Sequence, residues 1–173
     1  MGASASFAYF STTASGNQQK FVTGTLAITY TTGADINASG MVPTTESSAK
    51  EHTFTIENTG NITSTYSISF DGVGLTKNSA NTTSDNLSWK LYKATVNGSN
   101  YTASGEAVAS GTFGSTSSFT AGTTSLSILS NQTLAASASQ PYILRVWLNE
   151  TNAVQNDDQG LSLTATVKVD AKQ

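Results

Sequence analysis

The chain has 173 residues, of which 8 are Lys or Arg and 11 are Asp or Glu, so its net charge is −3 and its pI is about 4.9. This length is typical of a single domain. So few basic residues argue against nucleic acid or an anionic membrane surface as the main partner, because both require clustered Lys and Arg. The sequence contains no Cys, which excludes disulfides, thiolate metal sites and a Cys nucleophile.

The composition predicts a hydroxyl-rich surface. Ser and Thr account for 53 residues, whereas charged residues make up 11% of the chain. No segment approaches the length of apolar sequence that a transmembrane helix needs, so we expect no membrane contact in the mature protein. Met1 is followed by neither a basic segment nor a long apolar one. We therefore expect that a secretion signal has been removed and that the protein lies outside the cell or on its surface.

The first 19 residues are predicted to form a strand followed by a polar linker over residues 11–19. Small or aromatic apolar residues alternate with Ser and Ala in the strand. The apolar residues are Ala3, Ala5, Phe7, Tyr9 and Phe10. Two alternatives remain open for this strand. It is either the first strand of its own sandwich, or it adds to the open sheet of a neighbouring subunit, a head-to-tail contact that propagates into a filament.

Period-two alternation of apolar and polar residues recurs from residue 21 onward, and helical spacing is nearly absent. The predicted strands cover residues 21–31, 52–58, 62–70, 87–91, 126–128, 142–148 and 161–169, with a short run near residue 134 and a weak strand near residues 107–113. Phe54 and Ile56 are predicted to face inward. Ile143 and Trp147 indicate that their strand is covered on both faces. A turn at residues 58–61 is predicted to join the strands on either side of it as a hairpin.

Short strands with turn residues between them and two prolines predict an all-β fold. We expect a single-domain β-sandwich with jelly-roll-like connections. In this interpretation residues 1–19 are the N-terminal donor strand and its linker, and residues 20–173 are the sandwich.

Three segments form a series along the chain. The first is Ser6-Phe-Ala-Tyr-Phe-Ser11, which leads through the polar linker to Phe21-Val-Thr-Gly-Thr-Leu-Ala-Ile28. The second is Phe54-Thr-Ile-Glu-Asn-Thr-Gly60, and the third is the pair of strands at residues 143–149 and 161–171 with an Asn/Asp/Gln-rich loop at residues 153–160. In this order they resemble the TasA/camelysin family of secreted fibre proteins, which includes bacterial biofilm-matrix fibres and archaeal bundling pilins. Residues 79–140 carry little of the resemblance.

The resemblance implies a jelly-roll subunit that polymerises by N-terminal donor-strand complementation. Identical subunits are then the partners, the residues from Ala3 to Phe10 form the donor strand, and lateral bundling of filaments is a further expectation. The sequence departs from the family in two respects. Pro43-Thr-Thr-Glu46 stands where a Pro-Gly-Asp/Glu turn is common, and Ser, Thr and Asn replace a basic, Asp-rich surface. Both departures make the chain closest in character to the archaeal bundling pilins.

Asn-x-Ser/Thr sequons are more frequent than the composition explains. They include 8 of the 13 Asn residues, against about four expected by chance. The sequons begin at Asn37, Asn61, Asn81, Asn86, Asn97, Asn100, Asn131 and Asn149. The excess predicts covalent N-linked glycans that replace charge as the solubilising layer of a secreted protein. The alternative is that these are ordinary turn residues in a Ser/Thr-rich chain.

An enzyme is not expected, although camelysin gave part of the family a metallopeptidase label. Hydrolytic zinc needs about three protein ligands, whereas the single His of this chain, His52, has no His-Glu-x-x-His motif around it. His52 is predicted to be an exposed or half-buried strand residue. The sequence lacks a Gly-x-Ser-x-Gly motif for a serine nucleophile. We expect neither catalytic residues nor a metal nor a cofactor.

Two further features have a structural and a binding interpretation. Asn156-Asp-Asp-Gln-Gly160 offers oxygen ligands to calcium, but its composition is also that of a hairpin turn, which we favour. Trp89 and Trp147 would form a platform for sugar stacking if they were exposed, but each occurs among apolar strand residues, which favours the core.

The sequence thus predicts a structural subunit of an extracellular filament, a pilus or biofilm-matrix fibre, that polymerises head-to-tail by donor-strand complementation and supports cell adhesion. The alternative is a monomeric carbohydrate-binding or adhesin module on the cell surface. The two hypotheses predict different results: a filament subunit forms native assemblies far larger than one chain, whereas a binding module is monomeric and is retained by glycans.

Overall fold

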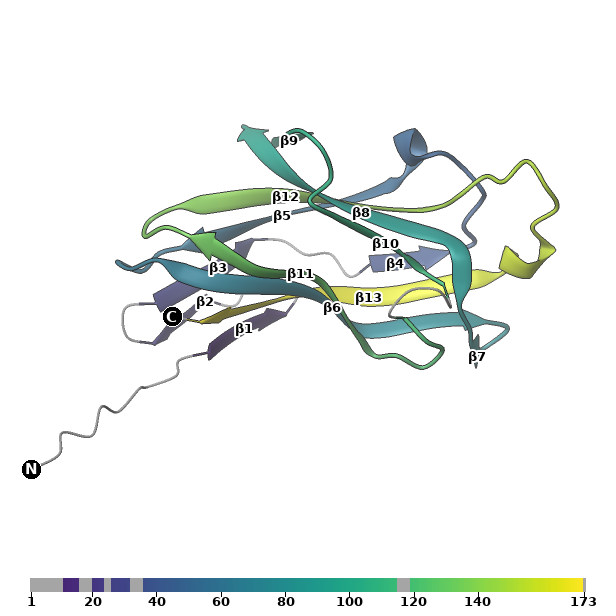
Figure 1. Ribbon diagram of the computed structural model, residues 1–173, viewed down its shortest axis with the longest axis horizontal. Coiled ribbons are helices and arrows are strands. Elements are labelled where there is room, and N and C mark those ends of the chain that lie inside the picture. The colour runs from purple at the N-terminus through teal and green to yellow at the C-terminus, as the bar shows by residue number, and fades with distance from the viewer. Residues whose placement is uncertain (1–10, 16–19, 24–25, 32–35, 115–118, 173) are drawn as a thin grey trace, which may run out of the picture.

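The computed structural model describes residues 11–15, 20–23, 26–31, 36–114 and 119–172, with the backbone alone described up to residue 31 and at residue 37. Two antiparallel β-sheets lie face to face (Figure 1), which confirms the predicted all-β sandwich. Among the described residues, no helix is long and apolar enough to cross a membrane.

The first sheet, sheet A, has the strand order β1-β13-β6-β11, with β4 also paired to β13 and β7 to β6. Its strands are β1 (Ser11–Ser15), β4 (Ile36–Ser39), β6 (Ser64–Lys77), β7 (Ala80–Asn81), β11 (Ser125–Leu134) and β13 (Leu161–Lys172). The second sheet, sheet B, has the order β10-β8-β12-β5-β3-β2, with β9 also paired to β8. Its strands are β2 (Lys20–Thr23), β3 (Leu26–Thr31), β5 (Lys50–Asn58), β8 (Ser84–Asn97), β9 (Asn100–Ala103), β10 (Ala109–Phe113) and β12 (Ser139–Leu148).

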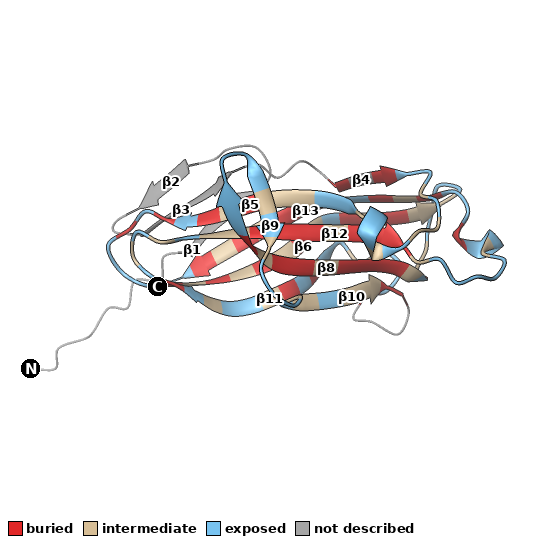
Figure 2. Cartoon of the chain, turned by 90° about the horizontal axis from the view of Figure 1, so that it is seen from above, coloured by how far each residue is buried: buried red, intermediate tan, exposed pale blue. Residues whose placement is uncertain are grey.

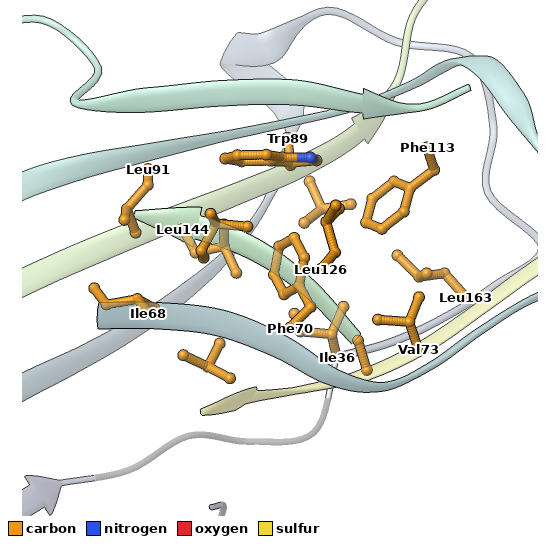
Figure 3. Packing of buried hydrophobic residues seen from close by; sticks show 14 of the residues in the cluster. Ile36, Ile68, Phe70, Val73, Trp89, Leu91, Phe113, Leu126, Leu144 and Leu163 are labelled. Atoms are coloured by element: carbon orange, nitrogen blue, oxygen red, sulfur yellow. The ribbon is translucent and has the colours of Figure 1, made fainter. Parts of the chain in front are cut away.

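The core lies between the two sheets, because alternate residues of each long strand point inward. Figure 3 shows side chains of both sheets meeting there, with Phe70 of β6 below Trp89 of β8. Their ring centroids are 5.6 Å apart and the ring planes are nearly perpendicular, a favourable edge-to-face geometry. Phe54 and Ile56 are buried as predicted.

The inward pattern of β6 shifts by one residue at Gly72. Phe70 is buried before this position and Val73 after it. Gly72 has φ +60°, a left-handed conformation that an L side chain adopts only with strain. The shift is a β-bulge, and it explains why period two predicted β6 only as far as residue 70.

Strand β12 is covered on both faces, as Ile143 and Trp147 predicted. Leu144 and Val146 are buried between the sheets, whereas Ile143 packs on the outer face with Tyr92. Figure 2 shows the β9 hairpin above buried residues of β8 and β12. The hydroxyl groups of Tyr101 in β9 and Thr55 in β5 are 2.9 Å apart, so the hairpin is fastened across the outer face of sheet B.

Two predictions about the N-terminal part were wrong. Residues 21–31, predicted as one strand, form the hairpin β2–β3, in which Thr23 pairs with Leu26. The sequence has Gly24 between the two strands, and Gly is a turn signal. Residues 11–15, predicted as part of the polar linker, form β1. Backbone pairing with β13 determines this strand, and it needs no apolar side chains.

Two predicted hairpins are instead connections between the sheets. β5 pairs with β3 and β12 in sheet B, whereas β6 pairs with β11 and β13 in sheet A, so residues 59–63 cross from one sheet to the other. Residues 149–160 similarly connect β12 in sheet B to β13 in sheet A. They contain the short 3-10 helix η2 (Asn156–Asp158). Alternation of apolar and polar residues predicts where a strand lies but not which strand it pairs with, and this accounts for both errors.

Candidate functional site

Strand β13 has a composite edge. One side of β13 pairs with β6 along its length, from Leu161 to Lys172. On the other side β4 pairs with residues 162–165 and β1 with residues 168–172. Two short strands that are separated in sequence by the β2–β3 hairpin therefore share a single edge of sheet A. This edge (the β13 edge) is the candidate assembly site.

The β13 edge borders a fully apolar strip of the core. The odd-numbered residues of β13 are all buried between the sheets, with exposed fractions of 4% or less. These residues are Leu161, Leu163, Ala165, Val167, Val169 and Ala171. By contrast, β1 has the sequence Ser-Thr-Thr-Ala-Ser. The strand that pairs with the C-terminal half of β13 thus carries almost no apolar surface of its own.

The predicted donor residues Ala3, Ala5, Phe7, Tyr9 and Phe10 lie outside the described residues. In the sequence they directly precede β1, which the structure describes. The first residue of β1, Ser11, pairs with Lys172 near the C-terminal end of β13 (Figure 1). The apolar segment is therefore joined to the strand that occupies the β13 edge.

The structure divides the predicted sequons into two groups. The side chains of five are exposed, namely Asn61, Asn81, Asn97, Asn100 and Asn131. Those of Asn86 and Asn149 are partly buried, and their amide groups make hydrogen bonds within the protein. Asn37 lies in β4, and its side chain is outside the described set.

Asn86 belongs to a polar cluster around Asp158, which is 7% exposed. Its amide donates a hydrogen bond of 2.7 Å to the carboxylate of Asp158, and the Ser84 hydroxyl donates one of 2.6 Å. Burial alone would raise the pKa of Asp158, but these hydrogen bonds, one from Gln155 and the charge of Lys77 outweigh burial and lower it. The cluster fastens η2 to the start of β8. The prediction that residues 156–160 form a hairpin turn was wrong, because these residues belong to a connection between the two sheets.

Asn149 is held in the same region of the molecule. Its amide nitrogen donates to the Ser88 hydroxyl at 2.6 Å, and its amide oxygen accepts a hydrogen bond from the Trp147 indole. Ser88 is also the hydroxyl residue of the sequon that begins at Asn86. Two of the eight sequons are therefore parts of the packing that joins β8, β12 and the β12–β13 connection.

Asn58 directs the crossing from sheet B to sheet A. It is fully buried, and its amide nitrogen lies 2.8 Å from the carbonyl oxygen of Ile62 and 3.1 Å from those of Leu134 and Ala135. Its amide oxygen accepts a hydrogen bond from the backbone N–H of Gly60. The Asn-x-Gly pair of the second resemblance segment thus has a structural purpose, which is to satisfy the backbone of two connections at once.

The outer face of sheet B carries an ion-pair cluster around Glu46, the first residue of the 3-10 helix η1 (Glu46–Ser48). Its carboxylate accepts hydrogen bonds from Lys90 at 2.6 Å, from Arg145 at 3.4 Å and from the Tyr92 hydroxyl. Burial would raise the pKa of Glu46, but these donors lower it. The cluster fastens η1 to β8 and β12. Nothing in the sequence pattern had singled out Glu46 for this role.

The structure places the residues that were considered for catalysis and sugar binding. His52 is half-buried in β5, as predicted, and burial together with the charge of Lys50 lowers its pKa. Among the described residues, no group of three or more His, Asp or Glu side chains is placed to hold a metal ion. Trp89 and Trp147 are 5% and 6% exposed, which confirms the prediction that they belong to the packed interior.

Two shallow pockets flank residues 40–44, where the chain passes from β4 toward η1. The first has a volume of 160 Å³ and lies beside Met41 and Leu148, and the second has a volume of 230 Å³ and lies beside Val42 and Trp147. Apolar side chains line both pockets, together with the carboxylates of Glu150 and Asp158 in the first and the ammonium group of Lys50 in the second.

Asn58, Asp158 and Glu46 are the residues with structural roles that sequence reasoning missed. Asn58 followed by Gly60 was a usable signal, because a buried strand that ends in Asn-x-Gly indicates a side chain that caps the turn. The partners of Asp158 and Glu46 are distant in sequence, so no local pattern indicated these contacts.

Comparisons of this chain with protein-family models, with curated proteins and with solved structures found no match.

Proposed function

We propose that this protein is the structural subunit of an extracellular filament that assembles head-to-tail, as members of the TasA/camelysin family do. In this proposal, the apolar N-terminal segment of one copy pairs with the β13 edge of the next copy. The single observation that carries the proposal is the composite β13 edge, where two short strands meet, one of them continuous with that segment.

Exchange of the N-terminal segment between copies conserves backbone hydrogen bonds. If β1 leaves its own sheet and the corresponding segment of a neighbour takes its place, the N–H and C=O groups of residues 168–172 are paired before and after. An exchange of identical elements therefore costs little. If each copy donates its segment to a different copy from the one whose segment it accepts, the contact does not close on itself, and a chain of subunits grows.

The exchange adds apolar burial if the incoming segment pairs further along β13 than β1 does, so that its apolar residues take the place of Ser11–Ser15. Phe7 and Tyr9 of the incoming segment would supply side chains that Ser11–Ser15 lack. Burying an aromatic or aliphatic side chain contributes about 1.5 to 3 kcal/mol. Two or three such side chains, together with a row of strand hydrogen bonds, would make dissociation slow without disulfides. Durable association of this kind suits a pilus or a biofilm-matrix fibre.

Electron microscopy of two matched double variants tests the proposal. Phe7→Asp with Tyr9→Asp should abolish filaments, because the charges occupy the apolar face of the donor strand. Ser4→Asp with Ser6→Asp adds the same charge at the alternate positions of the same strand and should leave filaments intact. Both variants should stay folded, since the substitutions lie outside the cluster of buried residues from Ile36 to Ala171.

Filaments of normal length from the Phe7→Asp, Tyr9→Asp variant would contradict the donor role. A native protein that is monomeric and retained on a glycan column would instead support the surface carbohydrate-binding alternative.

A further inference from the structure

We propose that the protein carries N-linked glycans on its exposed sequons and none on Asn86 or Asn149, and that two of these glycans, on Asn81 and Asn131, cover the second edge of sheet A. The inference rests on the extracellular location in the proposed function, because N-glycan transfer takes place on exported chains. It adds a modification site and a role for it, which is to leave the β13 edge as the one place on sheet A where a strand can add.

The chemistry of the modification requires a free side-chain amide. Its nitrogen attacks the anomeric carbon of a saccharide held on a lipid-linked phosphate or pyrophosphate. The bond from that carbon to the phosphate oxygen breaks, the phosphate keeps the electron pair, and the transferase takes one amide proton. The product amide carries a bulky polar group on nitrogen. It must therefore project into solvent in the folded protein.

Asn86 and Asn149 do not meet this requirement. The amide nitrogen of Asn86 is 2.7 Å from the Asp158 carboxylate, and that of Asn149 is 2.6 Å from the Ser88 hydroxyl. Each nitrogen gives one of its two hydrogens to that partner, and both side chains are partly buried, so a saccharide in place of the other hydrogen would crowd the packing around the partner. Modification before folding would then block the packing of the β12–β13 connection, and modification after folding would find the nitrogen enclosed.

Asn131 and Asn81 lie on the side of sheet A opposite to the β13 edge. β11 is the last strand on that side, and β7 continues the side beyond the end of β11, pairing with β6 at Thr76 and Lys77. The Asn131 side chain is exposed, and the residue sits at an interruption of the β11–β6 register with φ 54°. Asn81 is likewise exposed.

The other exposed sequons occupy turns. Asn97 and Asn100 pair with each other at the tip of the β8–β9 hairpin, on either side of Gly98 and Ser99. Directly opposed residues of an antiparallel pair have neighbouring side chains, so two glycans would crowd each other there. We expect at least one of the two residues to be modified. Asn61 lies on the crossing from β5 to β6.

An unpaired strand edge is a place where another chain can add, and natural sheets protect such edges. Among the described strands β11 pairs with β6 alone, so a glycan on Asn131 stands beside the outer backbone of β11. A protein that polymerises through strand addition needs this protection most, because its assembly depends on using one edge and not the other. The sequons at β7 and β11 therefore fit a subunit whose strand addition is restricted to β13.

Peptide mass spectrometry of protein isolated from its natural source tests the assignment. Saccharide masses are expected on Asn61, on Asn81, on Asn131 and on Asn97 or Asn100, with Asn86 and Asn149 unmodified. Unmodified peptides at all five exposed sequons would overturn the proposal, as would a glycan on Asn86 or Asn149. In the natural host, Thr133→Ala should remove the Asn131 glycan and Thr133→Ser should keep it, although both leave Asn131 in place.

The covering role has a separate readout. Asn81→Gln with Asn131→Gln, placed in the Phe7→Asp, Tyr9→Asp background, should show a several-fold larger associated fraction in analytical ultracentrifugation than the background alone. Asn61→Gln in the same background is the control and should leave the associated fraction unchanged. If the double variant sediments like its background, the covering role is wrong. Native protein that carries no glycan and still forms filaments would refute this inference and leave the proposed function standing.

Discussion

The Asn58 side chain lies fully buried where the chain leaves sheet B, and it contacts the carbonyl oxygens of both connections at that end of the sandwich. A buried polar group is tolerated because each of its hydrogen-bonding atoms has a partner. The same arrangement makes the protein sensitive to any substitution that replaces the amide nitrogen of Asn58, a hydrogen-bond donor, with an acceptor. The amide nitrogen of Asn58 is surrounded by acceptors, so an oxygen in its place would be repelled by all of them.

Asn58→Asp should therefore lower the free energy of unfolding by about 3 kcal/mol or more, because it buries a carboxylate against carbonyl oxygens. Asn61→Asp makes the same chemical change at an exposed position three residues later and should cost less than about 0.5 kcal/mol. Denaturant unfolding of monomeric protein, made in a host that adds no N-glycans, gives both values. Equal midpoints for the two variants would show that Asn58 does not organise the crossing.

At the scale of the elements, the connection between β12 and β13 is fastened by Asp158 and should loosen in acid. The pKa of Asp158 is lowered in the folded protein, so its contribution to stability is present above the unfolded value near 3.8 and is lost as the pH falls through the folded value. Asp158→Asn, which cannot accept from both Ser84 and Asn86, should cost about 2 kcal/mol at pH 7.

The difference in unfolding free energy between the wild type and Asp158→Asn should shrink as the pH falls below 4. Glu46 also has a lowered pKa, but it is present in both proteins, and its effect cancels in the difference. Asp157→Asn removes the same charge from an exposed neighbour and is the control. A difference that stays constant from pH 7 to pH 2.5 would contradict the role of the Asp158 carboxylate.

The elements also show what the sequence could predict. Alternation predicted the long strands and their buried residues, since it depends on nothing beyond the residues of one strand, as in β13. It gave neither the partner of β5 nor that of β6, because partners are chosen by the packing of both sheets. The short β9 escaped prediction since its residues are mostly polar or small, and it is held by pairing with β8. The β13 edge could not be anticipated for the same reason, because two distant segments create it.

At the scale of the whole molecule, the proposed function requires a sandwich that folds without its own N-terminal strand. The core that the structure describes is drawn from residues 36 to 171. The backbone of β1 pairs with β13, but its sequence offers little apolar surface. A chain that lacks residues 1–19 should therefore fold while leaving residues 168–172 without β1. Such a chain is an acceptor without a donor.

A synthetic peptide of residues 1–15 should bind this truncated chain and stabilise it. Ligand that binds the folded state alone adds about 2.7 kcal/mol when its concentration is 100 times Kd, which corresponds to a rise of roughly 5 to 10 °C in Tm for a protein of this size. The same peptide with Phe7→Asp and Tyr9→Asp keeps β1 but loses the apolar donor face, and it should raise Tm far less. Equal shifts with both peptides would mean that β1 alone supplies the affinity, and the aromatic residues would then have no part in joining one subunit to the next. A concentration-dependent shift with the first peptide alone would place the driving force for assembly in the burial of Phe7 and Tyr9.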